Sequence, residues 1–203
     1  VVEVMHAIKE GTIRGMYVQG ENPAMSDPDA NHARAALAAL DHLVVQDIFL
    51  TETAYLADVV LPASAFPEKT GTFTNTDRLV QMGRQAIDPP GQARQDLWII
   101  EQIANQLGCG WNYQHVSEVF DEMRHTMPSI AGITWDRLER EHAVTYPCEK
   151  EGDPGQSVVF VDDFPREDGK ARFVPADIIP ADERPDQDYP LILITGRQLE
   201  HWH

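Results

Sequence analysis

The sequence contains few of the residues on which several common protein classes depend. Only two cysteines occur, Cys109 and Cys148, and they form no Cys-x-x-Cys motif. We therefore expect neither a disulfide framework nor a zinc or iron–sulfur site ligated from within this segment, and the reducing cytoplasm is the default location. Basic residues are also scarce, since 16 stand against 33 acidic residues, a formal net charge of −17. This charge argues against binding to nucleic acid or to an anionic membrane surface, and no apolar run approaches the roughly 18 residues of a membrane span.

Motifs that would mark a familiar catalytic or cofactor site are missing as well. No serine lies in a Gly-x-Ser-x-Gly turn and no side chains pair as nucleophile and base, so we predict no catalytic residue in this chain. The Gly-x-Gly-x-x-Gly signature is absent, which disfavours an ordinary nicotinamide site. His201 and His203 form a His-x-His pair, but no further ligand lies near them in sequence, and we predict no metal site.

What is present, over residues 1–61, is an alternation of helical and strand patterns. Apolar residues recur at helical spacing from Ala33 to Leu40, and a nearly continuous apolar run follows, as expected for a strand buried on both faces. Asp27 and Pro28 match an N-cap followed by proline at the first helical position. The pattern predicts a parallel, Rossmann-like βαβαβ sheet. The expected elements are a helix around Val4 and Ile8, strands at 13–19, 43–49 and 58–61, and a short helix at 51–57.

The rest of the chain predicts a hairpin, three helices and an irregular excursion. Proline, glycine and aspartate are frequent from 146 to 188, and a buried strand at 191–194 would open a further domain. Both ends of the chain look cut, so we expect a piece of a longer polypeptide. The predicted elements are hairpin strands at 70–74 and 78–81, helices at 95–107, 116–126 and 134–142, and short strands at 157–161 and 171–174.

Polar turns follow two neighbouring strands of the predicted sheet. Gly20-Glu21-Asn22-Pro23 follows the first strand, and Asp47 and Thr51-Glu52-Thr53 follow the second. Taken alone, the first turn fits a plain turn as well as a site. However, ligands of open parallel sheets lie outside the carboxyl ends of the strands, where an acidic residue binds a ribose or base edge and helix-terminal N–H groups suit phosphate. The two turns together therefore predict a nucleotide site.

These motifs together resemble those of the molybdopterin-dependent oxidoreductases of the dimethyl-sulfoxide-reductase superfamily. The similarity is greatest to the catalytic alpha subunits of cytoplasmic, NAD-linked formate dehydrogenases. It covers essentially all 203 residues in order and is carried by residues 20–29, 43–53, 57–63, 68–78, 195–197 and 201–203.

The resemblance implies that the chain is an internal fragment. Residues 1–187 would belong to the third of four domains, an α/β domain that binds molybdopterin guanine dinucleotide, and residues 188–203 would begin the C-terminal domain. The whole subunit would hold molybdenum or tungsten between two such dinucleotides. Implied cofactor contacts are Gly20, Glu21 and Asn22 at the phosphate and ribose, Gln46, Asp47, Thr51 and Thr53 toward guanosine, Gly71, Phe73 and Asn75 toward the pterin, and Thr195, Gly196, Arg197, His201 and His203 from the last domain. Arg78 and Arg197 are the arginines that we expect at the pyrophosphate.

The resemblance also implies where the chemistry lies. In the family, the cysteine or selenocysteine that ligates the metal, the substrate arginine and the iron–sulfur cysteines all precede this segment, so the fragment alone would be inactive. The parent enzyme would oxidise formate to carbon dioxide and pass electrons through iron–sulfur and flavin subunits to NAD. Three alternatives remain: a sister enzyme such as nitrate reductase, a non-catalytic homologue such as the large iron–sulfur subunit of NADH dehydrogenase, and an isolated nucleotide-binding module.

Overall fold

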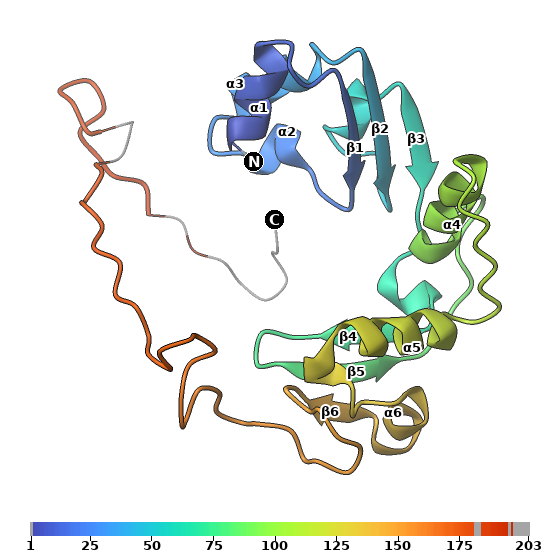
Figure 1. Cartoon of the computed structure of the whole chain (residues 1–203). Coiled ribbons are helices and arrows are strands. Elements are labelled where there is room, and N and C mark those ends of the chain that lie inside the picture. Colours follow the sequence, from blue (N-terminus) through green and yellow to red (C-terminus); the bar gives the residue numbers. More distant parts are fainter. Residues whose placement is uncertain (1, 181–183, 195, 197–203) are drawn as a thin grey trace. The chain divides into compact units, whose positions relative to one another are not determined.

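The computed structural model describes residues 2–180, 184–194 and 196. It divides into two compact units, residues Val1–Ser157 and Val158–His203. All helices and strands of the described residues lie in the first unit, as the sequence-coloured ribbon shows (Figure 1). Among these residues no helix is both long and apolar enough to cross a bilayer.

A three-stranded parallel sheet forms the first half of this unit. Its strands are β1 (Gly15–Gln19), β2 (His42–Asp47) and β3 (Val59–Pro62), in the order β1-β2-β3. Gln19 pairs with Gln46, and Asp47 pairs with Pro62, so all three carboxyl ends meet at one edge of the sheet. The predicted α/β class and the parallel sheet are confirmed.

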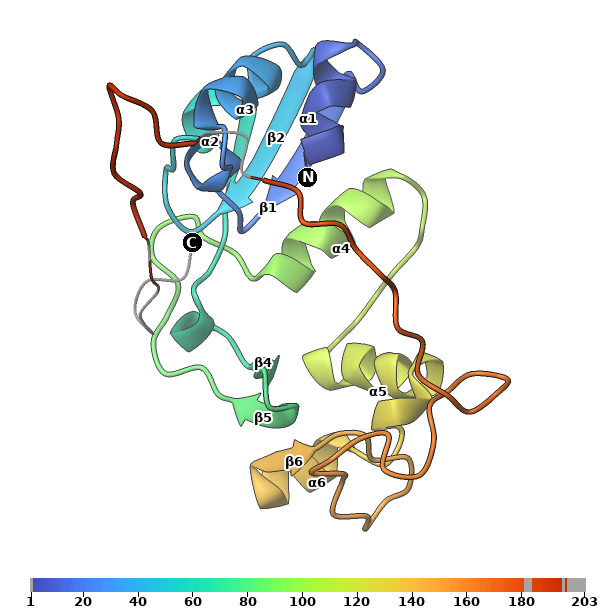
Figure 2. The same ribbon diagram turned by 90° about the vertical axis from the view of Figure 1, so that its left-hand side faces the viewer.

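Three helices cover one face of this sheet, α1 (Val2–Lys9), α2 (Pro23–Ser26) and α3 (Ala30–Leu37), and they lie together in both views (Figures 1 and 2). Three residues of the predicted stripe, Ala33, Ala36 and Leu37, are each at most 1% exposed, whereas Leu40 lies after the end of α3 and is half-buried. Their packing against the strands forms the first core, which comprises Met5, Ile8, Val18, Ala24, Ala33, Ala36, Leu37, Leu43, Val45 and Ala54.

The predicted start of α3 was wrong by two residues. Asp29, not Asp27, is the N-cap, and its carboxylate accepts a hydrogen bond from the backbone N–H of His32 at 3.0 Å. Residues 23–26 already form α2, and Asp27 adopts an extended conformation as the cap that ends it. Asp27 and Pro28 therefore lie in the turn between α2 and α3, and α3 begins after them.

The second half of the unit contains a small antiparallel sheet and three further helices. The predicted hairpin is confirmed as β4 (Gly71–Thr74) and β5 (Leu79–Gly83), and the predicted helices as α4 (Asp96–Gln106), α5 (Val116–Thr126) and α6 (Trp135–Glu141). A third strand that the sequence did not indicate, β6 (Ala143–Thr145), pairs with β5. Three short 3-10 helices complete the unit: η1 (Ala54–Leu56), η2 (Phe66–Glu68) and η3 (Pro128–Ile130).

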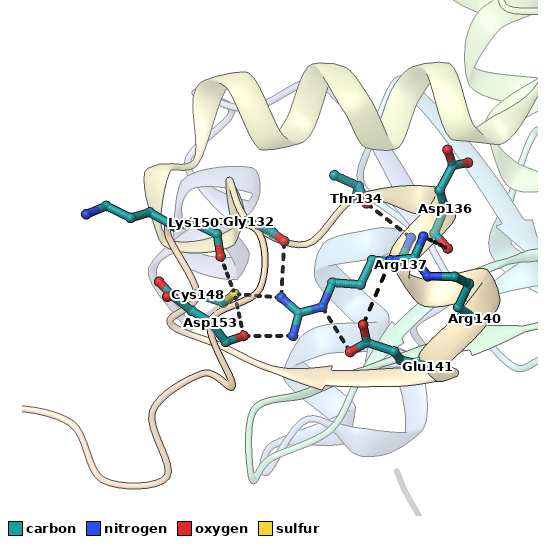
Figure 3. Close-up of polar contacts among 9 residues, drawn as sticks. All are labelled: Gly132, Thr134, Asp136, Arg137, Arg140, Glu141, Cys148, Lys150 and Asp153. Carbon is teal, nitrogen blue, oxygen red and sulfur yellow. Dashed lines mark hydrogen bonds and ion pairs between the residues drawn. The ribbon is translucent and has the colours of Figure 1, made fainter.

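A buried arginine forms several hydrogen bonds that connect segments of this second half (Figure 3). Arg137 is 5% exposed and donates hydrogen bonds to the carboxylate of Glu141 at 3.0 Å and to the main-chain oxygen of Asp153 at 2.7 Å. It also approaches the main-chain oxygen of Gly132 and the sulfur of Cys148, both at 3.3 Å. The guanidinium thus ties α6 to the segment that follows β6, beside a core of Val80, Phe120, Ile130, Ile133, Leu138, Val144 and Cys148.

Three predicted strands are not strands in the structure. Residues 157–161 form bends, and residues 171–174 and 191–194 have no regular secondary structure. Leu191, Ile192, Leu193 and Ile194 are each 73% exposed or more. An apolar run becomes a strand only where neighbouring strands supply hydrogen bonds and cover. Within the described residues, no strand pairs with any of the three segments.

Candidate functional site

A pocket of about 430 Å³ lies at the carboxyl edge of the parallel sheet. This is the edge at which ligands of open α/β sheets bind, and the volume is within the range of small-molecule sites. Three residues that the sequence predicted are brought together there: Gly20, Gln46 and Asp47. The full lining is Gln19, Gly20, Gln46, Asp47, Ile48, Ala63, Ser64, Ala65, Phe66, Lys69 and Asp96.

Gln46 lies at the centre of a polar network and is fully buried. Its side-chain oxygen accepts a hydrogen bond from the hydroxyl of Tyr17, and its side-chain nitrogen donates to Asp96 at 2.6 Å. Burial, and then the negative charge of Asp96, raises the pKa of the Tyr17 phenol, which keeps it protonated as a donor. Because its amide is bonded at both ends, Gln46 shapes the wall of the pocket.

Lys69 continues the network into the pocket. Its ammonium group forms an ion pair with Asp96 and donates to the main-chain oxygen of Ser64 at 3.1 Å. An ammonium has three donors, so one is left over. The hydroxyl of Ser64 is buried and has no hydrogen-bond partner among the described residues. Within the part of the chain that the structure describes, one N–H of Lys69 and the buried hydroxyl of Ser64 therefore have no acceptor.

Asp47 and Gly20 border the pocket at the ends of β2 and β1. One oxygen of Asp47 accepts a hydrogen bond from the backbone N–H of Ile48 at 2.7 Å, and no bond to its other oxygen occurs within the described residues. Gly20 has φ of +62°, a left-handed conformation that favours glycine, and its N–H donates to the main-chain oxygen of Gln46. The tight turn lets the chain leave β1 without closing the pocket.

The two predicted turns bind each other through Asn22. Its side-chain oxygen accepts from the N–H of Thr53 at 3.1 Å and from the Thr53 hydroxyl at 2.8 Å, and its nitrogen donates to Glu52 at 2.7 Å. The Thr53 hydroxyl in turn accepts from the N–H of Ala24 at 3.0 Å. Asn22 and Thr53 thus hold the two turns in register, and they do not line the pocket.

The remaining predicted residues of the first two turns are more exposed. The hydroxyl of Thr51 accepts from the N–H of Ala54 at 3.3 Å, and Glu21 is exposed. The bond from the amide of Asn22, followed by a local backbone bond, lowers the pKa of Glu52. The carboxylate of Glu52 therefore adds a negative charge beside the turn that follows β2.

The hairpin residues Gly71, Phe73, Asn75 and Arg78 lie outside the pocket lining. Asn75 accepts from the N–H of Leu79 at 3.0 Å. The Phe73 ring makes an edge-to-face contact with Phe66 at 6.3 Å between centroids, which brings the hairpin beside the pocket.

Arg78 donates only to main-chain oxygens in the described structure. These belong to Tyr146 and Gln156, each at 3.0 Å, and to Ser157 at 2.8 Å. Its expected role at a pyrophosphate stays a prediction. Four further predicted residues, Thr195, Arg197, His201 and His203, lie outside the described residues, and Gly196 is exposed.

Sequence reasoning missed Ser64, Phe66, Lys69, Asp96 and Tyr17. The first three follow the end of β3, so the strand-end rule that found Gly20 and Asp47 would have found them if applied to the third strand. Asp96 begins α4, 50 residues after Gln46, and no local signal joins the two. Among the described residues, no three His, Cys, Asp or Glu side chains are placed to hold a metal ion.

The parallel sheet and its polar edge pocket define an α/β protein with the binding-site layout of open-sheet domains. More particularly, the chain belongs to the molybdopterin oxidoreductase family, whose sequence profile matches residues 1–106. Membership in this family implies a molybdopterin cofactor.

Individual relatives narrow the comparison. The chain is 48% identical over 193 residues to the "F420-dependent formate dehydrogenase subunit alpha" of Methanocaldococcus jannaschii, covering 94% of this chain and 28% of the relative. It is 44% identical over 203 residues to the "F420-dependent formate dehydrogenase 2 subunit alpha" of Methanococcus maripaludis, covering 99% and 30%. The chain thus spans less than a third of the length of these relatives.

A solved structure supports the fold. Acetylene hydratase from Pelobacter acetylenicus matches 71% of this chain and 20% of its own, with a TM-score of 0.59 and 20% sequence identity.

The lining of the pocket suits a polar part of the molybdopterin cofactor that the family implies. Its volume of about 430 Å³ is within the range of small-molecule sites, and one oxygen of the lining residue Asp47 accepts no hydrogen bond from the described residues. Polar side chains converge on one open space at the edge where this fold class binds nucleotides. The residues present therefore fit a polar part of the cofactor.

Proposed function

We propose that this chain is part of the catalytic alpha subunit of a formate dehydrogenase, and that its sheet-edge pocket holds the guanosine end of a molybdopterin guanine dinucleotide. The observation that carries the proposal is the convergence of Asp47, Ser64 and Lys69 on one pocket at the strand ends of a molybdopterin oxidoreductase domain. The names of the two relatives above support formate as the substrate.

The part played by this chain is binding and orientation. Asp47 and its neighbours hold the nucleoside, and the bonds of Asn22 fix the two turns around it. The remaining predicted contacts belong to the same proposal: Glu21, Thr51, Gly71, Phe73, Asn75, Arg78, Thr195, Gly196, Arg197, His201 and His203. The bound cofactor, with molybdenum or tungsten, supplies the redox chemistry, and no residue of this chain is proposed to take part in it.

The electron acceptor is a separate part of the proposal. The sequence resemblance implies NAD, reached through iron–sulfur and flavin subunits, whereas F420 appears in the names of both relatives. The purified full-length complex is to be assayed with formate and each acceptor. We expect formate oxidation with one of the two. Reduction of nitrate without oxidation of formate would favour the sister enzyme, and absence of bound molybdenum, tungsten and guanine nucleotide would favour a non-catalytic homologue.

Replacing Asp47 tests the cofactor site directly. In the full-length protein, Asp47→Ala is expected to lower the guanine nucleotide and metal content severalfold, while the free energy of unfolding changes by less than about 1 kcal/mol because Asp47 makes a single local bond. Asp41→Ala, at the opposite end of β2, is the control and should retain the cofactor. Equal cofactor content in the Asp47 variant and the wild type would contradict the proposed site.

A further inference from the structure

A larger pocket, of about 570 Å³, is formed around the start of α4, and we call it the α4 pocket. Its main walls are the loop that precedes α4, the first turns of α4 and the end of the loop that joins α4 to α5 (Figure 2). It shares no lining residue with the pocket at the carboxyl edge of the parallel sheet. The cofactor site proposed above therefore leaves the α4 pocket unused.

Arg94 is the one lysine or arginine that lines the α4 pocket. Its guanidinium donates to the main-chain oxygen of Ala93 at 2.9 Å and lies 5.9 Å from the ring centroid of Trp98, a cation–π contact. Within the described residues Arg94 forms no ion pair, although six other arginines of this acidic chain do. Glu101, the acid of the lining, instead accepts from the backbone N–H of Tyr113 at 2.9 Å. Because a guanidinium has five N–H donors, Arg94 remains able to bind an anion.

The aromatic residues around the α4 pocket are exposed to an extent that is unusual for large apolar side chains. Trp98 is 48% exposed, and Trp111, whose ring lies 6.0 Å from that of Tyr113, is 41% exposed. Tryptophan, tyrosine and arginine are the residue types most enriched at the positions that contribute most to protein–protein binding. The α4 pocket therefore has the composition of a docking surface for a protein segment that carries a carboxylate.

The length and charge of the chain indicate the source of this segment. The chain spans 28% and 30% of the two relatives described above, so more than two thirds of each relative lies outside the matched part. The net charge of −17 repels free anions and acidic partner proteins at long range. A segment of the same polypeptide is tethered near the pocket, and its high effective concentration offsets this repulsion. An acidic segment of the parent polypeptide is therefore the occupant that the observations favour.

We propose that the α4 pocket is an interface within the parent polypeptide, in which an aspartate or glutamate from outside residues 1–203 forms an ion pair with Arg94 and its segment covers Trp98. The planar guanidinium suits a carboxylate because it donates two parallel hydrogen bonds to it. Covering the indole of Trp98 removes apolar area from water, so the contact gains from burial as well as from charge. The interface is independent of the cofactor site, and it fixes the first turn of α4, where Asp96 of the sheet-edge pocket lies.

Photocross-linking in the full-length protein tests this interface. p-Benzoylphenylalanine replaces Gln114 in one variant and Gln85 in another, because both residues line the α4 pocket and are exposed. We expect irradiation to link each position to a peptide of the same polypeptide that lies outside residues 1–203 and contains an aspartate or glutamate. Cross-links confined to residues 1–203 or to a partner subunit would overturn the proposal, and so would the absence of any cross-link at both positions.

Reversing the charge of Arg94 tests the ion pair itself. In the cross-linking variants, Arg94→Glu should lower the cross-link yield severalfold, because two carboxylates then repel each other. Arg172→Glu is the matched control and should leave the yield unchanged, since Arg172 is exposed and lies outside the pocket. Combining Arg94→Glu with an arginine in place of the cross-linked acid should restore the yield, which a folding defect would not allow.

A milder variant covers the case in which Arg94→Glu prevents folding. Arg94→Gln removes the charge without introducing repulsion, and it too should lower the cross-link yield. A yield that is unchanged in both Arg94 variants would overturn the ion pair, and failure of the combined charge swap to restore the yield would overturn it as well.

Discussion

At the scale of single residues, the candidate site separates side chains that shape it from side chains that face a ligand. Asn22 and Gln46 have both ends of their amides bonded within the protein. Ser64 and Lys69 retain a donor without a protein acceptor among the described residues. Substitutions of the first kind should therefore act on stability, and those of the second kind on binding.

Asn22 is the clearest case of a shaping residue. Asn22→Ala removes three hydrogen bonds and leaves the buried hydroxyl and the N–H of Thr53 without their acceptor. We expect a loss of about 2 kcal/mol in the free energy of unfolding, measured by urea denaturation. Asn31→Ala, exposed on α3, should change it by less than about 0.5 kcal/mol. Equal stabilities of the two variants would show that the turns need no such bond.

The bond between Asn22 and Glu52 also predicts a pH dependence. It lowers the pKa of Glu52 below the ordinary 4.5, so the native state favours the charged carboxylate. For a depressed pKa, the stabilisation is complete above the unfolded-state pKa and disappears as the pH falls through the folded-state pKa. Glu52→Gln should therefore be less stable than the wild type at pH 7, and the difference should shrink below pH 4.5. A difference that stays constant from pH 7 to pH 3 would contradict this assignment.

At the scale of elements, the sequence predicted those whose pattern is local. The helix over 116–126 agrees with α5 to the residue, because apolar residues repeat at helical spacing along it. The three residues of β6 have no pattern of their own and form a strand only because β5 lies beside them. Residues 191–194 show the converse, a strong strand pattern without a partner among the described residues.

The same division applies to the site. Gly20 and Asp47 were predictable because a strand and its following turn are adjacent in sequence, and the parallel sheet brings the strand ends together. The contact of Asp96 with Gln46 was not predictable, because it depends on where α4 packs. Side chains that meet only through tertiary packing leave no periodic signal.

Arg137 provides the test at this scale, because it joins α6 to the segment after β6 (Figure 3). Arg137→Lys keeps the charge but cannot reach Glu141, Gly132 and Asp153 together. We expect it to lower the free energy of unfolding by about 2 kcal/mol, measured in urea. Arg140→Lys, exposed on the same helix, is the matched control and should be nearly neutral. If the two variants are equally stable, the buried guanidinium does not hold these elements together.

At the scale of the whole chain, buried side chains are confined to the first unit. Both hydrophobic cores end by Cys148, and no described residue after Ser157 is buried. At the end of the first unit, the side chain of Arg78 donates hydrogen bonds to the main-chain oxygens of Gln156 and Ser157. Since burial of apolar area is the main source of folding stability, the first unit should carry the stability of the chain.

A chain ending at Ser157 tests this directly, because it retains both cores and every bond of Arg78. We expect its thermal midpoint to lie within about 2 °C of that of the 203-residue chain, since a loss of 1 kcal/mol would shift it by roughly 2–4 °C or more. A second chain ending at Tyr146 loses Cys148 and the main-chain oxygen of Asp153, and it should melt at a clearly lower temperature. The thermal midpoints of the three chains are to be compared by circular dichroism. If the chain ending at Ser157 melts as early as the one ending at Tyr146, residues 158–203 contribute to folding in a way that their exposure does not explain.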